Sequence, residues 1–174
     1  MLIKQFNYLI KIEYDGSKFV GWQHQTNGNS IQDNLEKVLS KLLKEKIKVI
    51  GAGRTDKGVH AKGQFANFKT QKKILEKKKL LNSLNYFLRS NLISILSIKK
   101  KKIKFHARFD AIERVYEYRI INRLASLSLN KRKAWHVKKK LNLSLMKKGA
   151  KVLEGKHDFS TYRAASCSAK SPIK

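Results

Sequence analysis

The first hundred residues show two different spacings of apolar side chains. Between residues 8 and 14, apolar and aromatic side chains occupy every second position and the turn pair Asp15-Gly16 follows, which predicts a strand with one buried face. From residue 31 the apolar spacing becomes three or four, which predicts a helix capped by Ser30, with Asp33 in the acidic position of a capping box. The same criteria predict strands over 47–52, 64–70 and 92–98 and a second helix over 74–87.

This order of elements, strand-helix-strand-strand-helix-strand, predicts an α+β fold of the ferredoxin-like kind. In such a βαββαβ unit the antiparallel sheet carries both helices on one face and leaves the other face free. We assign this unit to a first domain, residues 1–104, which carries the candidate catalytic loop described below. A free sheet face suits the binding of single-stranded or looped RNA.

Residues 105–174 predict a second, partial α+β domain. Alternation over 114–122, with Tyr116 and Tyr118 on the same side, indicates a strand. Residues 143–153 have the spacing of a helix, and residues 158–162 are strand-like. The pattern begins a second unit of the same kind and stops near its midpoint, so we expect an incomplete unit.

The net charge indicates a polyanionic partner. The chain has 40 Lys and Arg against 12 Asp and Glu, a formal net charge of +28. A folded surface with that much positive charge repels itself unless a polyanion is near, and nucleic acid is the usual partner. An alternative stays open, because Arg is scarce while Lys, Ile and Asn abound, a pattern that a genome of biased base composition produces without selection for binding. Under that alternative, the Lys runs at 77–79, 99–102 and 138–140 are merely solvated.

Cysteine and histidine usage argues against disulfides and against a metal site. Cys167 is the only cysteine, and the five histidines are scattered along the chain. The N-terminal residues lack the core and the cleavage site of a signal peptide, and no apolar stretch approaches membrane-spanning length. We therefore expect a cytoplasmic protein that holds no metal and does not contact a membrane.

A glycine-rich loop over residues 51–61 carries the candidate chemistry. Its glycines allow a ligand to approach the backbone closely, but the loop has neither the Gly-Lys-Ser/Thr of a P-loop nor the glycine spacing of a dinucleotide site. It presents one carboxylate, Asp56, between the cations Arg54 and Lys57. Neighbouring cations favour the ionised form of an acid, which suits a nucleophile better than a general acid. Spacing alone leaves open that Asp56 caps a turn or pairs with Arg54.

The stretch Gly53-Arg54-Thr55-Asp56-Lys57-Gly58-Val59-His60-Ala61, followed by Gly63-Gln64, resembles the active-site motif of the tRNA pseudouridine synthase I (TruA-type) family. Further blocks match the family in the same order, and together they cover essentially the whole chain. These blocks are Glu13-Tyr14-Asp15-Gly16, Gly21-Trp22-Gln23, Ser30-Ile31-Gln32, residues 105–109, Arg114 with Tyr116, Tyr118 and Asn122, Asp158-Phe159, and Tyr162-Arg163-Ala164.

The resemblance implies an isomerase that converts uridine to pseudouridine at tRNA positions 38 to 40, in the anticodon stem-loop. It implies no cofactor and no metal, and a homodimer in which one tRNA touches both subunits. Asp56 would be the nucleophile, Arg54 would help to flip the target nucleotide out of the stack, and Tyr116 would stack on the uracil ring. The tRNA contacts that it implies are Phe105, His106, Ala107, Arg108, Phe109, Tyr162, Arg163, Ala164, Ala165 and Ser166.

Several alternatives remain open. Tyr116 and Tyr118 also fit ordinary strand-core positions, and residues 105–109 fit a plain strand in which Arg108 alone contacts phosphate. The family continues beyond the matched region with an apolar, Arg-containing stretch that nothing here matches, so we expect a fragment or a truncated product with weak activity and unpaired sheet edges. The charge also fits a non-catalytic basic RNA-binding module, a truncated relative of the enzyme, or a ribosomal-type structural protein, which would leave the loop unexplained.

Overall fold

The computed structural model describes residues 4–26, 28–163 and 171–173 of the chain. Contacts divide the chain into two compact units, residues 1–117 and residues 118–174, and each unit is described by itself. Residues 105–117, predicted as part of the second domain, group by contacts with the first unit.

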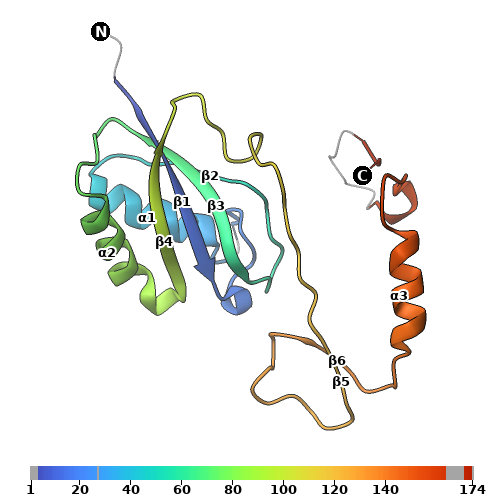
Figure 1. The fold of residues 1–174 in the computed structure, drawn as a ribbon. Coiled ribbons are helices and arrows are strands. Elements are labelled where there is room, and N and C mark those ends of the chain that lie inside the picture. The colour runs from blue at the N-terminus through green and yellow to red at the C-terminus, as the bar shows by residue number, and fades with distance from the viewer. Residues whose placement is uncertain (1–3, 27, 164–170, 174) are drawn as a thin grey trace. The chain divides into compact units, whose positions relative to one another are not determined.

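The first unit is built around an antiparallel sheet of four strands. Its strands are β1 (Phe6–Tyr14), β2 (Val49–Gly51), β3 (Ala61–Thr70) and β4 (Ile93–Lys101), in the spatial order β2-β3-β1-β4 (Figure 1). The central strand β1 is therefore paired along both edges, with Tyr14 opposite Ala61 of β3 and Ile93 of β4. All four predicted strands are confirmed, and their bounds shift by no more than three residues.

Two helices, α1 (Ile31–Leu43) and α2 (Lys77–Leu88), cover one face of this sheet (Figure 1). Burying each large apolar side chain contributes about 1.5–3 kcal/mol, so this face supplies most of the stability of the unit. The α+β class with an antiparallel sheet is confirmed. The fully buried side chains that join β1 to both helices include Tyr8, Ile10, Ile12, Leu35, Leu39, Leu84 and Leu88.

The two helices begin in different ways. At the start of α1 the Ser30 Oγ accepts the Asp33 N–H at 3.0 Å and donates to the Asp33 carboxylate at 2.7 Å, so the predicted capping pair is confirmed. Helix α2 begins at Lys77, three residues later than the predicted start at residue 74. The Ile74 N–H donates instead to the Tyr8 hydroxyl at 2.8 Å, which ties this residue to the sheet.

The face of the sheet opposite the helices is partly covered by the chain that follows β4. Asn7 and Asn67 are buried side by side there, with the Asn67 Nδ2 donating to the Asn7 Oδ1 at 3.0 Å. The Asn7 Nδ2 donates to the carbonyls of Lys102 and Phe105 at 3.1 and 2.8 Å, and the Asn67 Oδ1 accepts the Ala107 N–H at 2.8 Å. The expectation of a free face is wrong at this end of the sheet, because two buried amides need partners and find them in this segment.

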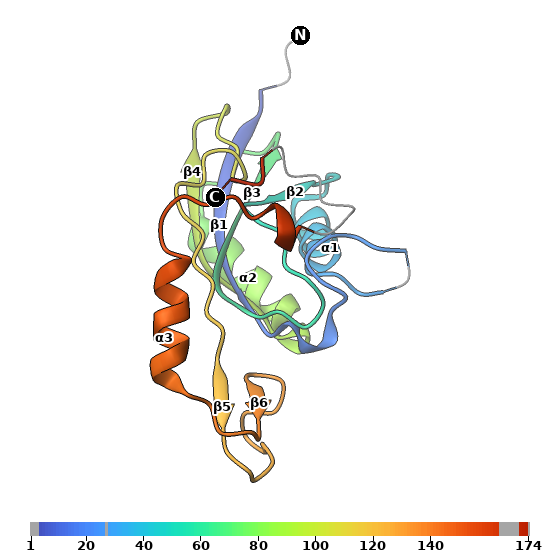
Figure 2. The same ribbon diagram turned by 90° about the vertical axis from the view of Figure 1, so that its right-hand side faces the viewer.

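The second unit contains the strands β5 (Ile120–Asn122) and β6 (Trp135–Val137), which pair in parallel, and the helix α3 (Leu143–Val152) (Figure 2). Helix α3 confirms the predicted helix to within one residue. The predicted strand over 114–122 is wrong over 114–119, because within this described stretch only residues 120–122 pair with another strand.

The prediction of a strand-like stretch over 158–162 is also wrong apart from one bridge, between Asp158 and Ile173. The Asp158 carboxylate accepts the N–H and the hydroxyl of Ser160 at 2.8 and 2.6 Å. This local turn leads into a short 3-10 helix, Ser160–Tyr162, which competes with extended pairing. In the described parts of the chain, none of the helices is long and apolar enough to cross a membrane.

Candidate active site

The loop that joins β2 to β3, residues 52–60, is fixed where it begins. The Gln64 Nε2 donates to the Gly53 carbonyl at 2.6 Å. The Arg114 guanidinium donates twice to the Ala52 carbonyl, from Nε at 3.1 Å and from Nη2 at 2.8 Å. Two side chains from outside the loop therefore hold its first residues against the sheet.

Thr55, the residue before Asp56, is held through both its main chain and its side chain. Its carbonyl accepts the Trp22 N–H at 2.9 Å, and its Oγ1 lies 2.9 Å from the Tyr14 hydroxyl. Tyr14 and Trp22 are both buried, and their ring centroids are 6.2 Å apart. The connection between β1 and α1 thus supports the loop directly beneath the candidate nucleophile.

Two glycines of this connection allow it to approach the loop so closely. A Cβ on Gly16 would lie 2.0 Å from the Val59 carbonyl oxygen. A Cβ on Gly21 would lie 2.8 Å from the Thr55 carbonyl oxygen, and its φ of +133° is one that other residues rarely adopt. The Gly16 N–H also donates to the His60 Nδ1 at 3.3 Å, so the far end of the loop is held as well.

Asp56 itself is exposed, and only its backbone takes part in the turn, where its carbonyl accepts the Val59 N–H at 3.2 Å. Its carboxylate forms no hydrogen bond or ion pair with any residue of the described ranges. The alternatives in which Asp56 caps a turn or pairs with Arg54 are therefore not what the structure contains. Arg54 and Lys57 are also exposed. The loop presents a carboxylate between two cations, all three accessible to a ligand.

Tyr116 lies beside this loop. Its hydroxyl would be 3.8 Å from a Cβ placed on Gly53. Burial raises the pKa of the Tyr14 phenol above its ordinary value, the hydrogen bond to Thr55 opposes this rise, and the nearby Tyr116 adds to it. Tyr116 and Tyr118 are 61% and 92% exposed, so neither is the strand-core residue that the alternative expected.

The segment 105–109 combines one buried residue with exposed ones. Ala107 is buried, whereas Arg108 and Phe109 are exposed, and the ring of Phe109 stacks on His106 with centroids 4.3 Å apart. The Arg114 Nη2 donates to the Arg108 carbonyl at 2.8 Å as well as to the loop. Arg114 therefore links the predicted RNA-contacting segment to the loop of Asp56.

The comparisons with known proteins agree with the motif. The family described as tRNA pseudouridine synthase matches residues 10–110, more than half of the chain. The chain belongs to the tRNA pseudouridine synthase family. It is similar to "tRNA pseudouridine synthase A" of Pelagibacter ubique, with 55% identity over 97% of this chain and 69% of that protein. The proteins of the same name from Neorickettsia sennetsu and Ehrlichia ruminantium are each 46% identical to it over 96% of this chain and over 69% and 68% of their own lengths.

Other predicted site residues of this pseudouridine synthase family member lie in its second unit. Tyr162 ends the short 3-10 helix, its ring centroid is 6.1 Å from that of Phe159, and Arg163 follows it. Ala164, Ala165 and Ser166 lie outside the described residues. Arg114, Tyr14 and Thr55 were not among the predicted site residues, although all three stand in the blocks that carried the family resemblance.

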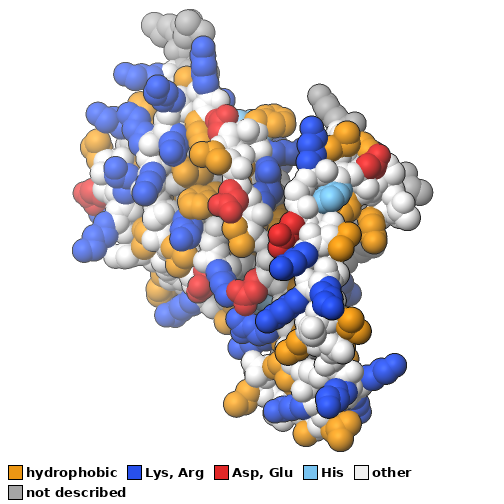
Figure 3. Space-filling model, turned by 45° about the vertical axis from the view of Figure 1, so that its right-hand side comes forward, with side chains coloured by type: hydrophobic (Ala, Val, Ile, Leu, Met, Phe, Trp, Pro, Cys, Tyr) orange, Lys and Arg blue, Asp and Glu red, His pale blue; other side chains and the backbone are white. Residues whose placement is uncertain are grey.

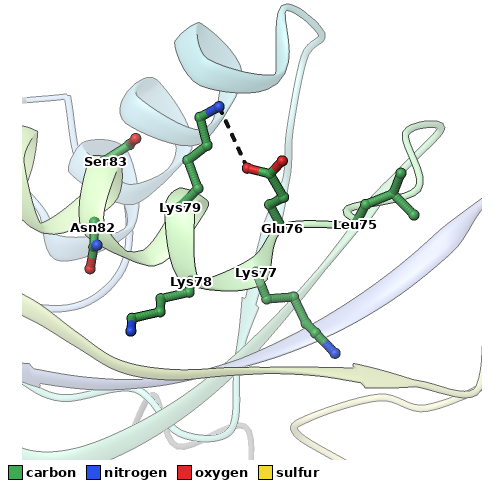
Figure 4. Close-up of a pocket in the computed structure, with 7 residues that line it drawn as sticks. All are labelled: Leu75, Glu76, Lys77, Lys78, Lys79, Asn82 and Ser83. Atoms are coloured by element: carbon green, nitrogen blue, oxygen red, sulfur yellow. Dashed lines mark ion pairs between the residues drawn. The ribbon is translucent and has the colours of Figure 1, made fainter.

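Two hollows on the surface of the described units contain no residue of this loop. One lies at the start of α2 and is lined by Leu75, by the run from Glu76 to Lys79, and by Asn82 and Ser83; Lys79 pairs with Glu76 at 3.5 Å (Figure 4). The other, in the second unit, is lined by Lys140, Leu141, Asn142 and Leu143. Neither contains a residue of the loop, so we assign neither to the chemistry. Within the described ranges, no group of His, Cys, Asp and Glu is placed to hold a metal ion.

Proposed function

We propose that this chain is a tRNA pseudouridine synthase that isomerises uridine at positions 38 to 40 of the anticodon stem-loop, with Asp56 as its nucleophile. The observation that carries this proposal is the exposed Asp56 carboxylate, unpaired among the described residues, on a loop held on both sides. A nucleophile needs both features, because an internal ion pair would occupy it and a mobile backbone would misplace it.

The reaction rearranges bonds within one nucleotide. The bond from C1′ of the ribose to N1 of uracil breaks, the base turns, and a bond from C1′ to C5 forms. The proton of C5 is lost and N1 gains one, so product and substrate have the same composition and no cofactor is needed. A carboxylate attached covalently to C1′ or to the ring keeps both halves in the site while the base turns.

Other residues take supporting roles in this proposal. Arg54, two residues before Asp56, would enter the stack as the target nucleotide leaves it. Tyr116 would stack on the uracil ring, which its exposed position beside the loop supports. Segment 105–109 and the residues from Tyr162 to Ser166 would contact the tRNA backbone.

We further infer that the first unit is ferredoxin-like. The strand order β2-β3-β1-β4 and the two helices packed on one face support this. The first domain would carry the catalytic loop and the second would add tRNA contacts. We also propose that the protein is a homodimer and is located in the cytoplasm. Sedimentation analysis with and without tRNA tests whether it forms the dimer.

Replacement of Asp56 tests the assignment. With tritium at C5 of uridine, a single-turnover reaction with protein in excess releases tritium as the C5 proton is lost. We expect Asp56→Asn and Asp56→Ala to abolish release and to keep tRNA affinity within about twofold, because neither removes a cation. Glu154→Gln in the exposed second unit is the matched control and should behave as the original chain. Release of tritium by the Asp56 variants would refute the role of Asp56.

The charge of +28 favours a second candidate, a non-catalytic basic RNA-binding module. It predicts tRNA binding without tritium release by any form of the chain. Tyr116 separates the two candidates further. As an enzyme residue, Tyr116→Phe should keep the stacking ring and most of the rate, whereas Tyr116→Ala should lose stacking worth about 1–3 kcal/mol, or about 5- to 150-fold.

A further inference from the structure

Six exposed lysines gather at the end of the sheet that is remote from Asp56. Strand β1 runs from Phe6 to Tyr14, and its Tyr14 end contacts the loop of Asp56. At about 3.3 Å per residue, the Phe6 end lies about 25 Å away. We call the lysines near Phe6 the lysine cluster; its members are Lys4, Lys69, Lys100, Lys101, Lys102 and Lys104, all exposed.

The fold assembles this cluster from three separate parts of the chain. The strand register places Lys69 of β3 and Lys101 of β4 opposite Asn7, on its two sides. Lys4 precedes β1, and the turn after β4 adds Lys102 and Lys104. In Figure 3, Lys and Arg side chains crowd the end of the first unit where the chain begins. Four of the six come from one segment, residues 100–104, and the fold brings Lys4 and Lys69 to it.

Aromatic rings and a fixed backbone hold the cluster in place. The ammonium groups of Lys4 and Lys100 lie 5.9 and 5.4 Å from the centroid of Phe6, and that of Lys101 lies 5.0 Å from Phe105. Such contacts orient a cation without neutralising it. The buried Asn7 amide, bonded to the carbonyls of Lys102 and Phe105, fixes the backbone of the turn.

Ion pairs within the described ranges do not neutralise the charge of the cluster. None of its six lysines forms an ion pair with a residue of the described ranges. The Glu45 and Asp110 carboxylates accept backbone N–H groups, those of Gln71 at 3.2 Å and His106 at 2.9 Å. The cluster is therefore a preorganised cationic surface that no ion pair within the described ranges neutralises.

We propose that the lysine cluster binds the phosphate backbone of the tRNA outside the anticodon stem-loop. This inference rests on the proposed function, since it takes the nucleotide at Asp56 as the fixed point. A distance of about 25 Å spans at least about seven base pairs, because an A-form RNA helix rises less per pair than the about 3.4 Å of B-DNA. RNA that starts at the loop and follows β1 therefore reaches the cluster beyond the stem-loop. Ammonium contacts to phosphate carry no sequence information, and they suit a surface that holds tRNAs of different sequence.

The test compares two RNAs and two matched variants by fluorescence anisotropy. The RNAs are a full-length unmodified tRNA transcript and the isolated anticodon stem-loop, each titrated at several salt concentrations. The variants of the 174-residue chain are Lys100→Gln/Lys101→Gln/Lys102→Gln in the cluster and Lys77→Gln/Lys78→Gln/Lys79→Gln in the exposed first turn of α2 (Figure 4). Both variants lose three charges.

We expect the cluster variant to bind full-length tRNA about tenfold or more weakly than the original chain, and to bind the stem-loop unchanged. Its slope of log K against log salt for full-length tRNA should become shallower by about two to three, since each phosphate contact contributes about 0.7–0.9. The α2 variant should keep both affinities. Equal losses for both RNAs, no loss, or losses that the α2 variant matches would overturn the proposal.

One further outcome would reassign the surface. If the cluster variant keeps its tRNA affinity but loses binding to phosphatidylserine-containing vesicles, the cluster recognises a lipid surface and the proposal is wrong. The Asp56 experiment is independent of these results, because it measures tritium release. A failure of the cluster proposal therefore leaves the test of the nucleophile intact, and the reverse also holds.

Discussion

The Tyr14 hydroxyl lies 2.9 Å from the Thr55 hydroxyl, one residue before the carboxylate that the proposed chemistry requires. Tyr14 belongs to the central strand and is 3% exposed, so this bond ties the loop to the rigid core. We expect Tyr14→Phe and Thr55→Val to lower the single-turnover rate by about 3- to 10-fold and to leave tRNA affinity unchanged. The reason is that a shifted loop misplaces Asp56 without removing a tRNA contact.

The double variant and a conservative variant separate positioning from general damage. If the two hydroxyls act through their mutual bond, Tyr14→Phe/Thr55→Val should lose no more rate than either single variant. Thr55→Ser keeps the hydroxyl and should keep the rate. Additive losses, or an affinity that falls as much as the rate, would show that the bond does not act by positioning.

Tyr14 also predicts how stability depends on pH. Its phenol has a raised pKa in the folded chain, chiefly because it is buried. Above about pH 10 the unfolded chain has lost this proton while the folded chain keeps it, so the free energy of unfolding should fall as pH rises through that range. Below about pH 9 both states are protonated and Tyr14 contributes no pH dependence.

Urea denaturation of the original chain and of Tyr14→Phe between pH 7 and pH 11 measures this effect. Lysines also titrate in this range, but they do so in both proteins, so the difference between the two curves isolates Tyr14. We expect the free energy of unfolding of the original chain to exceed that of Tyr14→Phe by a constant amount up to about pH 9. Above about pH 9 this excess should shrink. Parallel curves over the whole range would contradict the prediction.

Gly16 should tolerate no side chain. A Cβ there would meet the Val59 carbonyl oxygen at 2.0 Å, and because this contact is with backbone, the loop itself must move. We expect Gly16→Ala to lower the free energy of unfolding by about 1–3 kcal/mol and the rate of tritium release by more than the Tyr14 variants do. Gly149→Ala is the control, because a Cβ on Gly149 would meet nothing within 4 Å. Gly149 lies within α3, where alanine favours the helix more than glycine does, so this variant should not lower stability. Equal behaviour of the two variants would contradict the close approach.

The buried amide of Asn67 should hold the segment after β4. Asn67→Ala would leave the Ala107 N–H without its acceptor and remove the partner of the Asn7 Oδ1, at a cost of about 1–3 kcal/mol. Hydrogen exchange of the Ala107 amide should then become much faster. Asn82→Ala on the exposed side of α2 should change stability by less than about 0.5 kcal/mol and leave that amide protected.

Local patterns in the sequence predicted the elements of the first unit well. The Ser30 cap, the amphipathic α1 and all four strands followed from periodicity and turn residues, because in each case the element buries one face against the same core. The start of β3 was placed three residues too late, because pairing with β1 extends the strand to Ala61. Local spacing of apolar residues does not predict how far a strand pairs with a strand distant in the sequence.

Residues after position 113 show where local patterns fail. The alternation of Tyr116, Tyr118 and Ile120 is that of a strand. A strand also needs a neighbouring strand, and within the described stretch 114–122 only residues 120–122 have one. Asp56 was proposed as a site residue from its place in the glycine-rich loop and from the family resemblance, and Tyr116 from the resemblance. The contacts that hold the loop, from Tyr14, Trp22 and Arg114, join residues 33 to 62 positions apart and could not be derived from spacing.

The amide of Asn7 reaches the carbonyl of Phe105, 98 positions later in the chain. Strand β1 leaves the ribosome before β4 and before the segment that covers Asn7. At about 5–20 residues per second, the nascent chain keeps this strand without its final partners for about 5–20 s. The sheet of the first unit therefore cannot be completed before residue 105 has been synthesised, and slower decoding near residue 100 would lengthen the time that β1 spends without β4.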